Sequence, residues 1–257
     1  MSARSDLVTH CGARVVTREE LDGVEAPAAT DTWFPVKHAA VIDAVSRTLT
    51  GAGFAVRAVK YALSRGDARM FSTMDLDAPL ASGVSLAVGI RNSTDKSFPL
   101  GFCAGSKVFV CDNLAFRSDL LVRRKHTRFG RDRFEEAIAQ AVQSLEGFRA
   151  AEAERIRHFQ RADLTDATAD SLILRSYERG MVSHRQLPGV IKEWREPSFE
   201  EFQPRSLWSL LNAFTTALSG VRAANPQRFC ALTMGLQAFL GEAAGVPAAE
   251  PAYATPA

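Results

Sequence analysis

The densest group of residues suited to ligand binding lies between positions 117 and 133. Seven arginine and lysine residues in this stretch are opposed only by Asp119 and Asp132. Guanidinium groups bind phosphate through paired hydrogen bonds, and interleaved aromatic rings can stack on bases. A solvated strand end whose arginines pair with acids elsewhere is the structural alternative. We predict nucleic-acid contacts from the following set: Arg123, Arg124, Lys125, His126, Arg128, Phe129, Arg131 and Lys96.

A second polar group, Asn92-Ser93-Thr94-Asp95-Lys96-Ser97, interrupts two apolar stretches. Asparagine, aspartate and serine side chains bond to their own backbone, so turn chemistry explains such a cluster. The functional alternative is a polar lip in which Ser93, Asp95 and Lys96 face an anion such as phosphate. The chain has no glycine-rich phosphate-binding motif, so we expect no nucleotide cradle.

Oxygen, nitrogen and sulfur ligands near these stretches also allow a catalytic interpretation. Asp95 and Asp112, with Asp119 as a third candidate, could bind a metal ion, and His126 could act as a base for Cys111. No spacing requires either arrangement. We expect no cofactor, and we expect Cys11, Cys103, Cys111 and Cys230 to be ordinary thiols rather than zinc ligands.

Overall composition is that of a globular chain. The 257 residues are 46% hydrophobic and 23% charged, with a net charge of +2, so any electrostatic signal must come from local clustering. No apolar run is long enough to span a bilayer, and the N-terminal residues do not resemble a signal peptide. We expect a cytoplasmic protein without a membrane partner.

Hydrophobic periodicity predicts an α+β fold. Residues 1–34 are expected to be an irregular lead-in, and residues 35–53 a helix. Five strands should follow without intervening helices, which favours an antiparallel sheet. A mostly helical second half begins with one long amphipathic helix over 131–159. We expect a single domain over 35–245, with its sheet in 54–127 and its helices in 131–245, and a disordered tail over 246–257. The five predicted strands are 54–63, 68–76, 84–90, 99–111 and 114–126, and the later predicted helices are 166–180, 183–194, 206–220 and 225–241.

The chain carries an Asn-Ser-x-Asp-x-Ser turn over 92–97, a strand that ends in Val-Cys-x-Asn over 110–113, a Lys-His-Thr step over 125–127 and a Trp-x-x-x-Asn-Ala-x-Thr helix over 208–215. Together these four motifs resemble a phage- and plasmid-associated family catalogued as domain of unknown function 932, over roughly residues 35–220. The turn departs from the family pattern at Thr94 and Lys96, where histidine and glycine are usual. The strand end departs at Asp112 and Leu114, where serine and glycine are commoner. The resemblance implies a mobile-element setting and contact with DNA, without an established activity. Its motif residues in this chain are Asn92, Ser93, Asp95, Ser97, Cys111, Asn113, Lys125, His126, Thr127, Trp208, Asn212, Ala213 and Thr215.

Three functions are compatible with these patterns. The leading hypothesis is a non-enzymatic protein that binds single-stranded DNA and that could act as a homo-oligomer. The alternative is a metal-assisted hydrolase of nucleic acid that uses Asp95, Asp112 and His126. The third is a protein-interaction module built on the helical half, in which the basic stretch only keeps the surface solvated.

Overall fold

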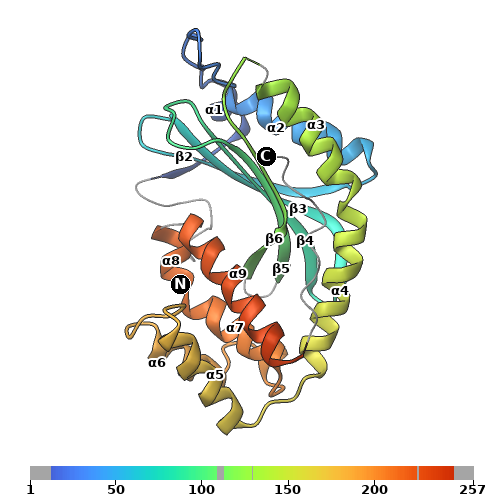
Figure 1. The fold of residues 1–257 in the computed structure, drawn as a ribbon, viewed down its shortest axis with the longest axis vertical. Coiled ribbons are helices and arrows are strands. Elements are labelled where there is room, and N and C mark those ends of the chain that lie inside the picture. The colour runs from blue at the N-terminus through green and yellow to red at the C-terminus, as the bar shows by residue number, and fades with distance from the viewer. Residues whose placement is uncertain (1–12, 109–112, 129, 225, 246–257) are drawn as a thin grey trace.

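The computed structural model describes residues 13–108, 113–128, 130–224 and 226–245. It has the predicted α+β fold, in which six antiparallel strands neighbour one another in sequence order (Figure 1). The first half consists of β1 (Arg14–Val16), α1 (Arg18–Asp22), α2 (His38–Gly51), β2 (Val56–Leu63), β3 (Arg69–Ala81), β4 (Val84–Ser93), β5 (Leu100–Val108) and β6 (Asn113–Arg124). The second half consists of α3 (Gly130–Gln143), α4 (Leu145–Arg161), α5 (Asp166–Glu178), α6 (Leu187–Arg195), the short 3-10 helix η1 (Glu200–Phe202), α7 (Leu207–Ala217), α8 (Ser219–Ala224) and α9 (Pro226–Ala243).

The five long strands β2–β6 correspond to the five strands predicted from the sequence. The prediction for the lead-in is wrong at residues 14–22, which form β1 and α1. Thr17 caps α1, since its hydroxyl accepts a bond from Glu20 N at 3.3 Å while Glu20 Oε2 accepts one from Thr17 N at 2.8 Å. This reciprocal capping box is a sequence signal for the start of a helix. The predicted tail over 246–257 lies outside the described residues.

The strand register brings three separated connections to one end of the sheet. Arg69 pairs with Ser93, Arg91 with Gly101, and Leu100 with Arg124. The connections 64–68 and 94–99 and the segment 125–128 therefore lie at this end, which we call the turn end. Residues 24–37, which have almost no regular structure, also reach the turn end, and we call them the strap.

The long helix predicted over 131–159 is two helices, α3 and α4, that meet at Ser144. The Ser144 hydroxyl donates to Gln140 O at 3.3 Å, and such a bond to the preceding turn commonly bends a helix. The prediction of an uninterrupted helix was therefore wrong at one residue. In Figure 1 the two helices run one after the other along one side of the sheet.

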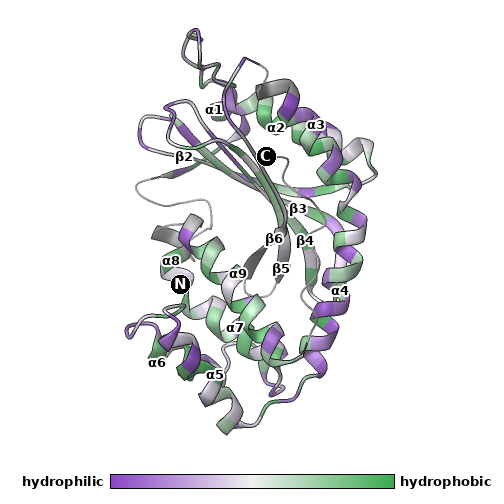
Figure 2. Ribbon diagram, in the orientation of Figure 1, coloured by the Kyte–Doolittle hydropathy of each residue, from purple (hydrophilic) through white to green (hydrophobic). Residues whose placement is uncertain are grey.

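Apolar side chains form two clusters on opposite faces of the sheet. One cluster joins α2 and α3 to sheet residues such as Met74 and Val88, and the other joins the helices α4–α9 to residues such as Ala87 and Cys103. Helix α4 contributes to both clusters, through Phe148 in the first and Phe159 in the second. Figure 2 shows apolar residues along the inner sides of these helices. No helix within the described residues is long and apolar enough to cross a membrane.

Strand β4 shows how the two clusters enclose the sheet. Its alternation places Val88 and Ile90 on one face and Ala87 and Gly89 on the other, and all seven residues over 84–90 are buried. Both faces are therefore covered along most of this strand. A strand that is solvated on one face would instead expose every second residue.

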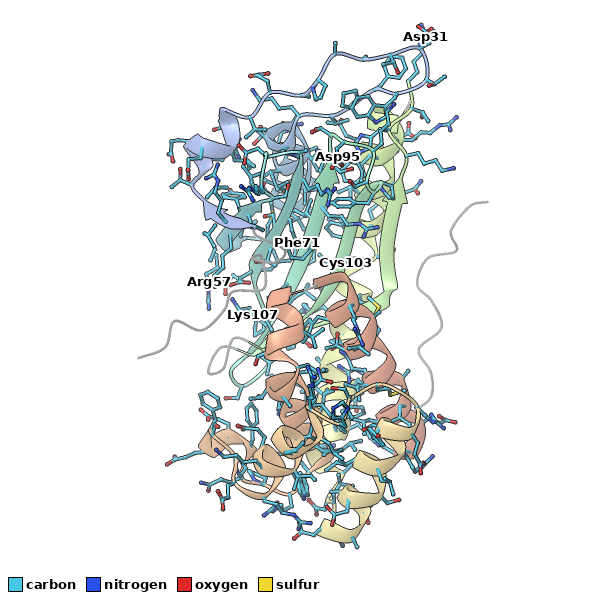
Figure 3. The ribbon with its side chains drawn as sticks, turned by 90° about the vertical axis from the view of Figure 1, so that its left-hand side faces the viewer. Asp31, Arg57, Phe71, Asp95, Cys103 and Lys107 are labelled. Atoms are coloured by element: carbon cyan, nitrogen blue, oxygen red, sulfur yellow. The ribbon has the colours of Figure 1, made fainter. Side chains whose placement is uncertain are left out.

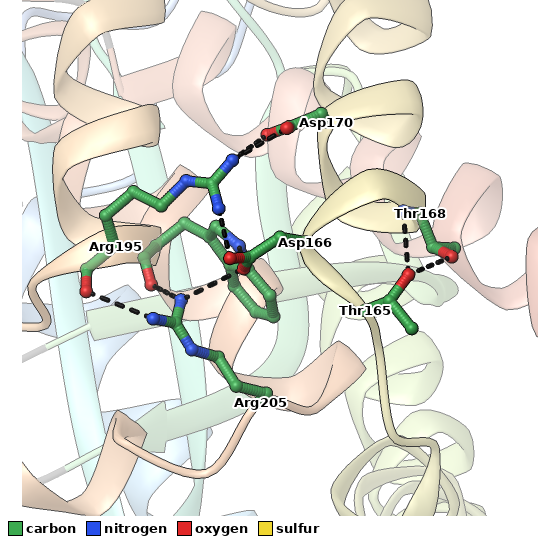
Figure 4. A network of polar contacts seen from close by, with 7 residues as sticks. Thr165, Asp166, Thr168, Asp170, Arg195 and Arg205 are labelled. Atoms are coloured by element: carbon green, nitrogen blue, oxygen red, sulfur yellow. Dashed lines mark hydrogen bonds and ion pairs between the residues drawn. The ribbon is translucent and has the colours of Figure 1, made fainter.

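A polar network fixes the helices farthest from the sheet (Figure 4). Asp166, at the first position of α5, accepts a bond from the indole nitrogen of buried Trp194 at 3.0 Å and forms an ion pair with Arg195. Arg195 also pairs with Asp170 at 2.6 Å, and Arg205 lies over the Trp194 ring at 5.0 Å. The network connects α5, α6 and the segment that enters α7.

Candidate functional site

The side chains of the connection 94–99 stabilise its own backbone. Asp95 accepts bonds from the backbone nitrogen of Ser97 at 3.0 Å and from the Ser97 hydroxyl, and it pairs with Arg69 at 2.7 Å. Partial burial would raise the pKa of Asp95, but the bonds from Ser97 and Arg69 outweigh it and lower the pKa. The Ser93 hydroxyl donates to Phe98 O at 2.7 Å and accepts from Phe98 N at 3.1 Å. These contacts are the turn chemistry predicted for the cluster.

Lys96 has an unusual backbone conformation, with φ of 66°. This left-handed region favours glycine, so a lysine here has a strained backbone. The Lys96 ammonium lies 5.0 Å from the centroid of the Trp33 ring. The turn therefore presents a cation above an aromatic ring of the strap.

Arg91 supplies a second pairing of a cation with a ring at the turn end. Its guanidinium lies 5.2 Å from the centroid of the Phe98 ring and across the backbone of Gly101. A Cβ atom at Gly101 would lie only 2.9 Å from Arg91 Nε. Glycine at this position therefore lets Arg91 lie flat against the strand directly opposite.

His38 and Asn92 form a buried hydrogen-bonded pair beneath the strap. The Asn92 amide nitrogen donates to Val36 O at 2.7 Å and lies 2.9 Å from His38 Nδ1. Because a carbonyl oxygen can only accept, the nitrogen of Asn92 must face Val36, and His38 Nδ1 is then an acceptor. His38 Nε2 carries the hydrogen and bonds Asp67 O at 3.0 Å. Burial lowers the pKa of His38, which is consistent with this neutral imidazole.

His126 is buried at the same end, with 7% of its surface exposed. Its carbonyl accepts a bond from Phe34 N at 3.0 Å, but neither ring nitrogen has a hydrogen-bond partner within the described part of the chain. Burial lowers the pKa of His126 despite an opposing interaction with the Phe34 backbone, and the lowered pKa favours the neutral imidazole. Its neighbours Lys125 and Thr127 are exposed.

The structure brings several predicted site residues together at the turn end: Asn92, Ser93, Asp95, Lys96, Ser97, Lys125, His126 and Arg128. The strap connects the two segments, since Trp33 contacts Lys96 and the adjacent Phe34 bonds His126. Figure 3 shows Asp95 at the turn end and Lys107 toward the opposite end of the sheet. Lys107 forms a buried ion pair with Asp75 at 2.6 Å.

Other predicted residues lie elsewhere. Asn113 begins β6 at the end of the sheet opposite the turn end, while Trp208 and Asn212 are buried in α7, where the Asn212 amide donates to Trp208 O at 2.9 Å. Trp208 is thus a core residue. Cys111 and Asp112 lie outside the described residues, as do the side chains of Arg123, Arg124, Phe129, Arg131 and Asp119.

The catalytic interpretation receives no geometric support from Asp95, whose carboxylate is already bonded to Ser97 and Arg69. Among the described residues, no group of three or more histidine, cysteine, aspartate and glutamate side chains could hold a metal ion. Cys103 is a buried thiol that donates to Gly89 O at 3.7 Å.

Sequence reasoning missed three residues of this site, Trp33, His38 and Arg91. Trp33 is a large aromatic residue in a segment rich in threonine, aspartate and proline, without helical or strand periodicity. An aromatic ring outside any regular element is a signal that could have identified it. His38 carries no such signal, because its role depends on contacts with Asp67 and Asn92, far away in the sequence.

Searches of protein-family models, curated proteins and solved structures found no match to this chain. The family resemblance described above therefore depends on the four sequence motifs alone.

Proposed function

We propose that the turn end of the sheet binds single-stranded nucleic acid, with DNA as the expected polymer, and that it does so without catalysis. The observation that carries this proposal is that Lys96 and Lys125, which are far apart in the sequence, both lie at the turn end of the sheet. Both side chains are exposed, and neither ammonium has a carboxylate partner within the described residues. Two such cations on one surface can contact successive phosphates of a flexible strand.

The aromatic residues at the turn end favour a single strand over a duplex. Trp33 and Phe98 are only partly buried and lie beside Lys96 and Arg91. Proteins that bind single strands combine a basic groove with rings on which bases stack, and the bases of a duplex are not available for such stacking. The sequence additionally predicts nucleic-acid contacts by Arg123, Arg124, Arg128, Phe129 and Arg131. The motif resemblance supports a mobile-element setting, in which single-stranded DNA is a common intermediate.

The test is a charge reversal at the turn end compared with an equal charge reversal in the helical half. Lys96→Glu combined with Lys125→Glu should weaken binding of a fluorescent single-stranded oligonucleotide by about tenfold or more, because two phosphate contacts are lost. Arg185→Glu combined with Lys192→Glu is the matched control, because these exposed cations lie in the segment 179–186 and in α6, away from the sheet.

Fluorescence anisotropy at about 50 mM and about 200 mM salt measures both affinity and its salt dependence. The unmodified protein should bind the single strand more tightly than a duplex of the same length, and its affinity should fall steeply with salt. Equal losses in the two double variants would mean that only net charge matters, and the proposal for the turn end would be wrong. The same measurement with the unmodified protein separates nucleic-acid binding from a purely protein-interaction role, for which no oligonucleotide should bind.

A further inference from the structure

Four side-chain atoms at the turn end are buried without a hydrogen-bond partner in the described chain. They are Trp33 Nε1, Asn92 Oδ1 and the two ring nitrogens of His126. Asn92 is fully buried, and His126 is more than nine-tenths buried. Buried polar atoms in native proteins nearly always have a hydrogen-bond partner. Several buried atoms without one, all at the turn end, therefore need a specific explanation.

The strap brings these three residues into one neighbourhood. Phe34, next to Trp33, bonds the carbonyl of His126 at 3.0 Å, and Val36 accepts the Asn92 amide at 2.7 Å. His126 also lies near enough to His38 that a charge on the His126 ring would lower the pKa of His38, and His38 contacts Asn92 directly. Strap residues 33–36 therefore include Trp33 and bond both the backbone of His126 and the side chain of Asn92.

The hydrogen-bonding capacity of these atoms selects for a neutral ligand. The Trp33 indole can only donate, Asn92 Oδ1 can only accept, and a neutral imidazole does one of each. An anion would be repelled by the Asn92 oxygen and would find no positive charge on His126. A planar group with a donor beside an acceptor satisfies all three residues, and the polar edge of a nucleobase has this arrangement.

We propose that Trp33, Asn92 and His126 form a site that takes one unpaired nucleobase from a strand whose phosphates contact Lys96 and Lys125. This inference rests on the proposed function, since it names what the same surface does with a base. Entry requires the strap to move away from the turn end. The outer strap residues 27–32 are exposed. Individual hydrogen bonds, such as that from Phe34 N to His126 O, hold the strap to the turn end.

The decisive probe is a single-stranded oligonucleotide compared with an abasic strand of equal length and charge. The unmodified protein should bind the intact strand about tenfold more tightly, which is the scale of one stacked and bonded base. Binding of the intact strand should also quench the fluorescence of Trp33. This quenching should disappear in Trp33→Phe, while the remaining tryptophans, buried Trp194 and Trp208, report that the fold is intact.

His126→Phe keeps an aromatic ring of similar shape and removes both ring nitrogens. It should lose the preference for the intact strand but keep the affinity for the abasic strand, and Trp33→Phe should do the same. If His126→Phe does not fold, the test uses Trp33→Phe alone. This variant keeps an aromatic ring but removes the indole nitrogen. Lys192→Glu, in the helical half, should keep the full preference.

The outcomes separate the two proposals. Equal affinity of the unmodified protein for the intact and abasic strands would overturn the base site and leave the phosphate surface standing. Failure to bind either strand would overturn the proposed function itself. A crystal structure with an oligonucleotide bound, in which only ordered water contacts Trp33, Asn92 and His126, would also overturn the base site.

Discussion

Lys96 combines a costly backbone conformation with a favourable side-chain contact. A non-glycine residue in the left-handed region destabilises the fold by about 1 kcal/mol relative to glycine. An exposed contact between a cation and an aromatic ring stabilises it by about 0.5–1 kcal/mol. Lys96 shows both effects: its φ is 66°, and its ammonium lies 5.0 Å from the centroid of the Trp33 ring. The contact with Trp33 thus offsets the strain of the turn.

Two substitutions separate these effects. Lys96→Ala keeps the strain and loses the ring contact, so it should lower the free energy of unfolding by about 0.5–1 kcal/mol. Lys96→Gly also loses the contact but relieves the strain, so its free energy of unfolding should stay within about 0.5 kcal/mol of the unmodified protein. Urea denaturation followed by circular dichroism measures both. If Lys96→Ala and Lys96→Gly lower the free energy of unfolding equally, the left-handed backbone at position 96 does not destabilise the protein.

At the scale of elements, Asp166 and Asp170 look alike in the sequence but differ in what they contact. Asp166 satisfies the indole nitrogen of Trp194, a side chain that is 1% exposed, and contacts Arg195 and Arg205. Asp170 contacts Arg195 through an exposed ion pair. Asp166 therefore holds α5 against α6, whereas Asp170 adds only a surface contact.

Asp166→Ala should lower the free energy of unfolding by about 1–3 kcal/mol, because it leaves a buried donor without a partner. Asp170→Ala is the matched control and should cost less than about 1 kcal/mol, the usual range for a surface ion pair. Thermal denaturation of both variants provides the comparison. If the two variants are equally stable, the indole bond does not hold the two helices together.

At the scale of the whole molecule, α4 connects the two apolar clusters that lie on opposite faces of the sheet. Phe148 belongs to the cluster of α2 and α3, while Ile156 and Phe159 belong to the cluster of the later helices. The sheet itself contributes to both, through Val88 on one face and Ala87 on the other. Loss of either cluster removes support from the other.

The two halves should therefore unfold together. Hydrogen exchange measured by mass spectrometry at increasing denaturant should show peptides from β3 and β4 losing protection at the same midpoint as peptides from α7. Single-domain proteins without populated intermediates show this coincidence. Two separate midpoints would mean that α4 does not couple the sheet to the helical half.

The sequence by itself determined the kinds and order of most elements. Alternation over 84–90 and the three- and four-residue spacing in 166–178 are local signals, and strands β2–β6 and helices α2, α5, α6, α7 and α9 follow such signals closely, whereas β1 and α1 were missed. The chemistry of Asp95 and Ser97 was also predictable, because each bonds to a residue two positions away. Local interactions of this kind depend on neighbours that the sequence displays directly.

Only the tertiary structure decided which distant residues meet. The register of β4, β5 and β6 brings Lys96 to the same end as Lys125, and the strap adds Trp33 and the burial of His126 beneath it. No local pattern encodes these contacts, since they follow from strand pairing between segments about 30 residues apart and from the packing of an irregular segment. The break at Ser144 was also visible only in the structure, because apolar periodicity indicates a helix but not the bond of the Ser144 hydroxyl to Gln140 O in the preceding turn.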